Sequence, residues 1–283
     1  MRRLFLFSSF MLFLFLPLWA DGVACLNSSI ADLWHLAGGV VDITVGEAVE
    51  RGFASPEAIL VDNASGRNIN SELLIASEPD LIIGSEDTSS HLQLKDFMDK
   101  HGKKMILVRQ DDFDDFLSYF QLFCSITGRD DLWQEHGEAQ KQEINDIIVA
   151  AKAHEEKPSV LFIRAGSAFS AVRAKGTGSH FASSIISDLG AINAYDAMDG
   201  KVETLSLEAL LTSDIDKILI VPQGNEEVSM DYINELFSQP GWRDIKAVRE
   251  GEVYFLPKEL FHFKPNGRWS EAYRMMESII YEE

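Results

Sequence analysis

The sequence predicts an α/β fold built from two lobes with mostly parallel sheets, joined by a single long helix. Short apolar runs, such as 23–26 and 80–84, alternate with amphipathic stretches of helical period. This is the pattern of a parallel sheet covered by helices on both faces. A long, highly charged stretch at 131–156 separates two regions of this kind, and 283 residues suffice for two lobes of ordinary size.

The chain opens with a predicted export signal, which we assign to residues 1–20. Arg2 and Arg3 precede an apolar run at 4–18, and this order is typical of a secretory signal peptide. The run is shorter than the roughly 20 residues that a membrane-spanning helix needs, although an anchor that is not cleaved stays open. We therefore expect an exported protein, in the periplasm or at the outer face of the cytoplasmic membrane.

The first lobe is assigned to residues 21–130. Its first strand, at 23–26, leads into a helix whose apolar face begins at Ile30 and whose end is marked by Gly38 and Gly39. Further strands are predicted at 80–84 and 104–108, and a further helix at 113–124 is closed by Gly128.

The joining helix is assigned to residues 131–157, because this stretch is highly charged, contains no glycine after Gly137 and stops at Pro158. The second lobe, at 158–283, repeats the alternation of the first. We expect each lobe to be Rossmann-like. In the second lobe, strands are predicted at 159–165, 217–222 and 252–257, and helices at 179–189, at 231–237 and from 269 onward.

Residues 72–83 and 208–219 repeat one arrangement. In each, a glutamate opens a short amphipathic helix, and an aspartate eight positions later leads into a strand. Helix-then-strand units converge on such patterns, and an acid in the first turn also stabilises a helix through its dipole. The repeat indicates that the two lobes are built alike.

Composition limits the partners. The chain has 25 basic and 45 acidic residues, a formal net charge of −20, so we expect no nucleic acid partner, because phosphate binding requires a basic face. A few basic side chains that converge in a cleft can still hold a small anion.

The two cysteines, Cys25 and Cys124, are too few for a disulfide framework. Three interpretations stay open: two buried free thiols, one disulfide, or lipid attachment at Cys25. The last is disfavoured, because 22–26 is expected to be the first core strand.

The strongest candidate site is the loop after the last predicted strand, within 255–270. Ligands gather at the carboxyl ends of strands in open α/β sheets, where cations bind carboxylate-like oxygens and aromatic rings form apolar walls. The alternative is a solvated basic loop whose aromatic rings fill the core. The expected ligand contacts from this loop are Lys258, His262, Lys264, Arg268 and Trp269.

A second basic set follows the predicted strand 159–165: Arg164, Arg173 and Lys175, ahead of a glycine-rich stretch at 176–178. Glycine-rich backbone before a helix can hold an anion, although a flexible hairpin with surface charges would look the same. Trp34 and His91 complete the expected ligand contacts.

The sequence lacks the signatures of several other sites. Its seven histidines show no HxxxH or HExxH spacing and its cysteines no CxxC, so we expect no protein-bound metal. The Walker order and the Gly-x-Ser-x-Gly elbow are also missing, which disfavours nucleotide hydrolysis and a serine hydrolase.

Taken together, the motifs resemble those of the helical-backbone substrate-binding proteins that serve ABC importers for iron chelates, haem and cobalamin. The resemblance rests on the opening 26–39, the block 72–84 with its Glu-Pro-Asp-Leu-Ile-Ile, the Thr-Gly helix end at 127–128 and the closing 256–269. It implies a ligand between two lobes that are joined by a stiff helix. It also implies that Glu72 and Glu208, one on each lobe, pair with arginines of the permease.

We therefore expect a monomeric receptor of an ABC import system that captures a ferric siderophore-like chelate, needs no cofactor and catalyses nothing. A cobalamin or haem receptor of the same fold is the first alternative. An exported enzyme with two Rossmann-like lobes and a degenerate receptor that has lost its ligand are the others. Family members commonly carry some tens of residues between the export signal and the first motif, whereas here Val23 follows almost directly.

Overall fold

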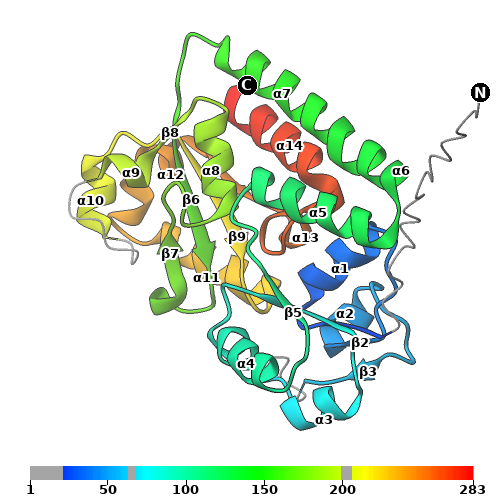
Figure 1. Cartoon of the computed structure of the whole chain (residues 1–283). Coiled ribbons are helices and arrows are strands. Elements are labelled where there is room, and N and C mark those ends of the chain that lie inside the picture. The colour runs from blue at the N-terminus through cyan, green and yellow to red at the C-terminus, as the bar shows by residue number, and fades with distance from the viewer. Residues whose placement is uncertain (1–21, 63–67, 199–205, 283) are drawn as a thin grey trace, which may run out of the picture.

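A computed structural model of the chain describes residues 22–62, 68–198 and 206–282 (Figure 1). The predicted export signal at 1–20 lies outside the described residues. No helix in the described ranges is long and apolar enough to cross a membrane.

The first lobe contains a parallel sheet in the order β3-β2-β1-β4-β5. β1 lies in its middle, with Ala24 opposite Ile43 on one side and Ile82 on the other. The strands are β1 (Val23–Cys25), β2 (Ile43–Thr44), β3 (Ile59–Leu60), β4 (Leu81–Ser85) and β5 (Met105–Val108). The helices are α1 (Ser28–Leu36), α2 (Gly46–Glu50), α3 (Ser71–Ala76), α4 (Ser89–Lys100) and α5 (Phe113–Thr127).

The second lobe contains a sheet in the order β10-β9-β6-β7, with β8 also paired to β6. All pairs are parallel except β6 with β7, where Arg164 lies opposite Arg173. The strands are β6 (Ser159–Ala165), β7 (Val172–Ala174), β8 (Ile192–Asn193), β9 (Lys217–Pro222) and β10 (Val253–Phe255). The helices are α8 (Phe181–Asp188), α9 (Ala194–Ala197), α10 (Leu207–Thr212), α11 (Glu226–Ser238), α12 (Lys246–Glu250), α13 (Lys258–Phe261) and α14 (Trp269–Tyr281).

The joining helix is one helical run with three parts: α6 (Asp130–Leu132), a π-helical segment (Trp133–Glu138) and α7 (Ala139–Lys152). It ends at Lys152, before the predicted end at 156, and residues 153–158 connect it to β6. Gly137 is required in the π-helical segment, since a Cβ there would lie 2.5 Å from the ring of Trp133.

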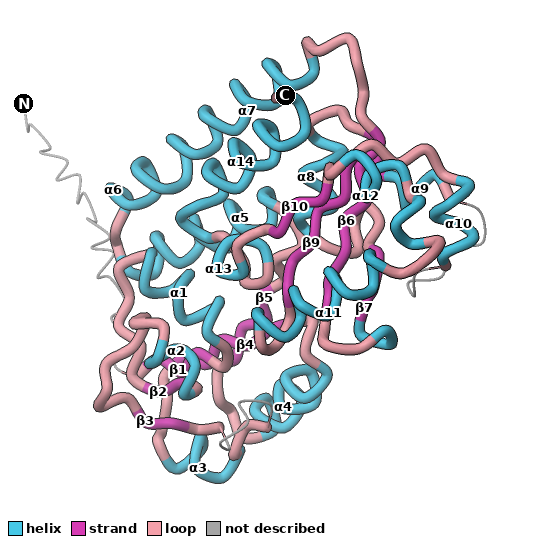
Figure 2. Tube along the Cα trace, turned by 180° about the vertical axis from the view of Figure 1, so that it is seen from behind, coloured by secondary structure: helices cyan, strands magenta, loops and turns pink. Residues whose placement is uncertain are grey.

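The hydrophobic core runs through the join between the lobes. α14 lies beside α7 (Figures 1 and 2) and also reaches α5 and α8. The Trp269 ring lies 5.7 Å from that of Phe113 on α5 and 5.4 Å from that of Phe181 on α8. The last helix of the chain therefore packs against both lobes and the helix that joins them.

Both cysteines are buried free thiols, the first of the three interpretations. Cys25 lies on the central strand β1 and Cys124 on α5. Burial raises the pKa of both, that of Cys124 to about 11, so neither carries a reactive thiolate at neutral pH.

Candidate functional site

A cavity of about 290 Å³ lies between the lobes, where the carboxyl ends of strands from the two sheets meet. We call it the cleft cavity. Asp87 and Asp111 enter it from the loops after β4 and β5, and Arg164 enters from β6. Residues 178–181 at the start of α8, His262 and Lys264 complete the lining. This is the location at which open α/β sheets bind ligands.

Arg164 and His262 contact each other in the cavity. Arg164 Nη2 lies 3.4 Å from His262 Nδ1, and since a guanidinium only donates, the imidazole accepts through Nδ1. Burial and then the charge of Arg164 lower the pKa of His262 to about 4. His262 is therefore neutral at ordinary pH and presents its Nε2–H as a donor.

Lys264 reaches from the second lobe to the first. Its ammonium group donates to the backbone carbonyl of Gln110 and lies 5.5 Å from the centre of the Phe181 ring. Burial lowers the pKa of Lys264, while Asp87 and Asp111 oppose that shift. The lysine thus contributes a positive charge to the lining of the cleft cavity.

His180 is a cavity residue that the sequence analysis missed. Its Nδ1 accepts from the backbone N–H of Ala182 at 3.2 Å and so caps α8, and its ring lies 4.9 Å from that of Phe162. Burial, and then the charges of Arg164 and Lys264, hold the pKa of His180 well below its usual value. Its place directly after the glycine-rich stretch, at a helix start, was the available signal.

Asp87 and Asp111 were also missed. Each follows the end of a predicted strand by a few residues, which is the position that ligand-binding side chains favour. An acid at such a place also suits a helix start, so the position alone does not distinguish a ligand contact from a helix-stabilising acid. The cavity therefore carries carboxylates that the predicted set of basic and aromatic residues did not include.

Four predicted contacts lie outside the cleft cavity. Lys258 donates to the carbonyl of Gly224 at 2.7 Å, and Arg268 forms two hydrogen bonds of 2.6 and 2.7 Å with Glu271. Arg173 is exposed on β7, and Lys175 follows that strand and is half-buried.

Trp34, His91 and Trp269 are buried away from the lining. The Trp34 indole donates to the carbonyl of Val40 at 2.8 Å, and Trp269 packs in the shared core. His91 Nδ1 accepts from the backbone N–H of Ser85 at 3.0 Å, and burial lowers the pKa of His91 to about 4. These three side chains support the elements around the cleft.

A second cavity of about 530 Å³ lies beside α1 and shares Lys264 with the cleft cavity. The guanidinium of Arg51 stacks over the ring of Phe263 at 3.9 Å and donates to Ser28 Oγ at 3.0 Å. Arg268 also lines this space. Lys264 therefore separates two compartments between the lobes.

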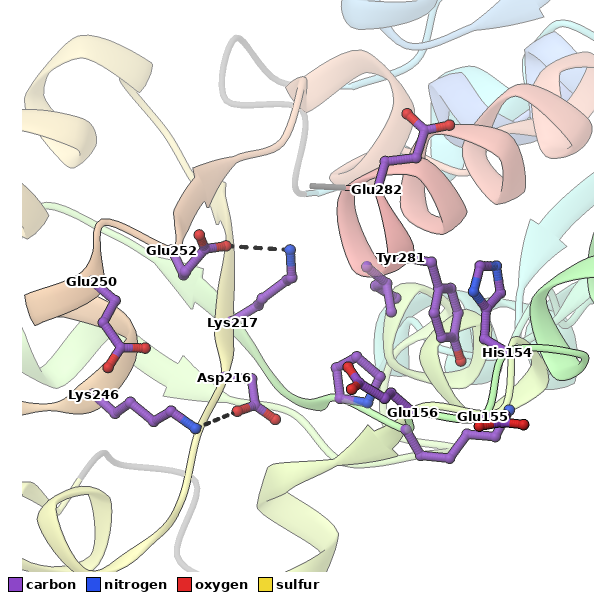
Figure 3. A pocket seen from close by; sticks show the side chains of 13 residues that line it. His154, Glu155, Glu156, Asp216, Lys217, Lys246, Glu250, Glu252, Tyr281 and Glu282 are labelled. Atoms are coloured by element: carbon purple, nitrogen blue, oxygen red, sulfur yellow. Dashed lines mark hydrogen bonds and ion pairs between the residues drawn. The ribbon is translucent and has the colours of Figure 1, made fainter.

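A third hollow of about 800 Å³ lies at the opposite, amino-terminal ends of β9 and β10 (Figure 3). Two of its lysines pair with acids of the same lining: Lys217 with Glu252 at 3.2 Å and Lys246 with Asp216 at 2.6 Å. Nowhere in the described part of the chain do three or more histidine, cysteine or acidic residues gather to hold a metal.

Glu72 and Glu208 are both exposed in the first turn of a short helix, α3 and α10 respectively. The caps are also alike: Asn70 Oδ1 accepts from the N–H of Leu73 at 3.1 Å, and Ser206 Oγ from that of Ala209 at 3.4 Å. The two helices lie far apart, at the outer ends of their lobes (Figures 1 and 2).

We compared the chain with known protein families, curated proteins and solved structures. A family model described as periplasmic binding protein matches residues 23–260. The Fe(3+)-citrate-binding protein YfmC of Bacillus subtilis (strain 168) is 26% identical over 186 residues, 65% of this chain and 56% of that protein. The matched stretch thus spans little more than half of this curated relative.

Solved structures agree on the fold. IsdE of S. aureus, complexed with heme, has a TM-score of 0.74 at 15% identity and covers 92% of this chain and 99% of its own. The periplasmic vitamin B12 binding protein BtuF of Vibrio cholerae has a TM-score of 0.71 at 15% identity, with coverage of 93% and 97%. The predicted fold of two α/β lobes with mostly parallel sheets is therefore confirmed.

Proposed function

Since this chain belongs to the periplasmic binding protein family, we propose that it captures a small metal chelate, of the ferric siderophore type, and delivers it to the permease of an ABC importer. The observation that carries the proposal is the cleft cavity, in which Arg164 and Lys264 face the space between the lobes. Exported and monomeric, the protein would release its ligand unchanged and catalyse nothing.

The chemistry of the second lobe suits a chelate. Guanidinium and ammonium groups donate to carboxylate, hydroxamate or catecholate oxygens, and the Nε2–H of neutral His262 adds a further donor. The ring of Phe181 supplies an apolar wall in the same cavity. Partly apolar cavities with a few convergent polar groups are typical of small-molecule sites.

Delivery requires a surface that the permease can recognise. We propose that Glu72 and Glu208 contact basic residues of the permease, one from each lobe. Their exposure and matched caps support this role. Exposed ion pairs contribute only about 0 to 1 kcal/mol each, but two widely separated pairs fix the docking orientation and the association rate.

A thermal-shift screen tests capture. The probes are ferric citrate, a ferric trihydroxamate, haem and cobalamin, each added to the mature protein. A ligand at a hundred times its Kd stabilises a protein by about 2.7 kcal/mol, so a binding chelate should raise the melting temperature by several degrees. If haem or cobalamin alone raised the melting temperature, the ligand would be that compound and not a ferric siderophore. If no probe raised it, chelate capture would be refuted.

The variant Arg164→Gln locates the site. We expect it to lose most of the ligand-induced shift, because it removes a donor from the cavity. Arg249→Ala is the matched control: this arginine of the same lobe is exposed and pairs with Glu250 at 2.9 Å. An unchanged shift in Arg164→Gln would place the ligand elsewhere.

A further inference from the structure

The cleft cavity carries opposite charges on its two sides. The first lobe contributes the carboxylates of Asp87 and Asp111, and the second contributes Arg164 and Lys264. His262 is neutral at ordinary pH. A ligand in this space therefore meets an acidic wall as well as a basic one.

Hydrogen bonds hold the backbone at both aspartates of the acidic wall, whose side chains are exposed at the edge of the cavity. The N–H of Asp87 donates to Ser85 Oγ at 3.1 Å, in a turn directly after β4. The N–H of Asp111 donates to Asp115 Oδ2 at 3.0 Å, at the approach to α5. Each carboxylate thus follows a strand end whose backbone is held by hydrogen bonds. The two also interact, since burial and then the charge of Asp87 raise the pKa of Asp111.

Nearby cations balance this wall only in part. Arg109 Nε lies 3.6 Å from Asp111, but it is 3.4 Å from Asp115, so that its charge is shared. Lys264 attracts both cavity acids, yet its ammonium donates to the Gln110 carbonyl.

This arrangement disfavours a chelate that is anionic on every side. Such a ligand would gain donors from Arg164 and be repelled by two carboxylates across the cavity. A chelate with a basic group on the opposite side satisfies both walls.

Building on the proposed function, we propose that the chelate bound in the cleft cavity carries a basic group, an ammonium or amine, which Asp87 and Asp111 bind while Arg164 and Lys264 hold its anionic oxygens. The ligand class is thus a mixed-charge chelate. Asp87 and Asp111 determine the specificity within it.

A matched pair of probes tests this. One is a ferric trihydroxamate with a pendent primary ammonium group, and the other is the same chelate with that amine acetylated; ferric citrate is the all-anionic reference. Titration by quenching of tryptophan fluorescence gives a Kd for each. We expect the wild-type protein to bind the ammonium form at least tenfold more tightly than the acetylated form and than ferric citrate.

The variants Asp87→Asn and Asp111→Asn should weaken binding of the ammonium form only. Each should weaken the ammonium form about tenfold and bind the acetylated form and ferric citrate as tightly as the wild type, or more tightly. A misfolded variant would lose all three ligands. Asp99→Asn is the matched control, because this exposed aspartate of the same lobe pairs with Lys95 on α4 and should leave all three Kd values unchanged.

The outcomes separate the two proposals. Equal binding of the two trihydroxamates by the wild type, or an unchanged preference in both asparagine variants, would overturn the mixed-charge ligand and leave chelate capture intact. Absence of binding by the two trihydroxamates, ferric citrate, haem and cobalamin would overturn both.

Discussion

Asn266 Oδ1 accepts a hydrogen bond of 2.9 Å from Gln110 Nε2, and this bond joins the second lobe to the first. The Asn266 side chain also donates to the Ser29 carbonyl at 2.9 Å and to Asp32 Oδ2 at 2.8 Å. Its own carbonyl accepts from Gln140 on α7 at 3.3 Å. One residue, 0% exposed, therefore ties both lobes to the helix between them.

Removing the Asn266 side chain should destabilise the protein by about 3 kcal/mol, because the buried amide of Gln110 and the half-buried carboxylate of Asp32 each lose this partner, at about 1–3 kcal/mol each. Asn266 has a φ of +46°, which glycine adopts freely and alanine does not. Asn266→Ala should therefore be less stable than Asn266→Gly by about 1 kcal/mol. Urea unfolding measures both values, and a loss below 1 kcal/mol in Asn266→Gly would show that the network contributes little.

The sequence predicted the strands that contain at least four residues. β4, β5, β6 and β9 are largely apolar runs that are buried, or in β5 partly buried, and their predicted positions agree with the structure to within about one residue. β2, β3 and β8 have two residues each and are too short to produce a period. The π-helical segment was hidden because Gly137 in a helical pattern has no distinctive signal.

The sequence predicted where the site lies better than it predicted which residues line it. Cations on loops after strands led to Arg164, His262 and Lys264, because strand ends define the cleft. Trp34 and Trp269 illustrate the limit, since an aromatic ring at helical spacing fits a core and a binding wall equally well. The role of Asn266 depends on four partner residues in three distant segments, which no local pattern contains.

His91 should make stability depend on pH. The unfolded-state pKa of a histidine is about 6.5, whereas burial lowers the pKa of His91 to about 4, and protonation of Nδ1 would remove the acceptor for Ser85. Between these values the unfolded state binds a proton that the native state excludes, so stability is highest above pH 6.5 and falls as pH decreases toward 4.

The lowered pKa of His91 should reduce the free energy of unfolding by about 2 kcal/mol at pH 5 relative to pH 7. In His91→Asn, which retains an acceptor that does not titrate, the loss of unfolding free energy between these two pH values should be smaller by that amount. Urea titrations at both pH values supply the comparison. If the wild type and His91→Asn lost the same unfolding free energy between pH 7 and pH 5, His91 would not be the source of the pH dependence.

Gly137→Ala should disrupt the joining helix, since the added Cβ would lie 2.5 Å from the Trp133 ring. Overpacking of this kind costs about 1–3 kcal/mol. Gly46→Ala is the control at the start of α2, where nothing lies within 4 Å of the added Cβ. Its effect should be neutral or stabilising by up to about 1 kcal/mol. Equal stabilities of the two variants in thermal unfolding would mean that Trp133 moves aside without cost.

Charge reversal at the proposed docking glutamates should separate delivery from capture. Glu72→Lys and Glu208→Lys replace exposed side chains on α3 and α10, so each should change stability by less than about 0.5 kcal/mol and leave the Kd for the ligand unchanged. Transport by the cognate permease in proteoliposomes should fall at least tenfold for the double variant, because two attractive contacts become repulsive. Glu138→Lys, an exposed reversal on the joining helical run, should transport like the wild type. Normal transport by the double variant would move the docking surface away from α3 and α10.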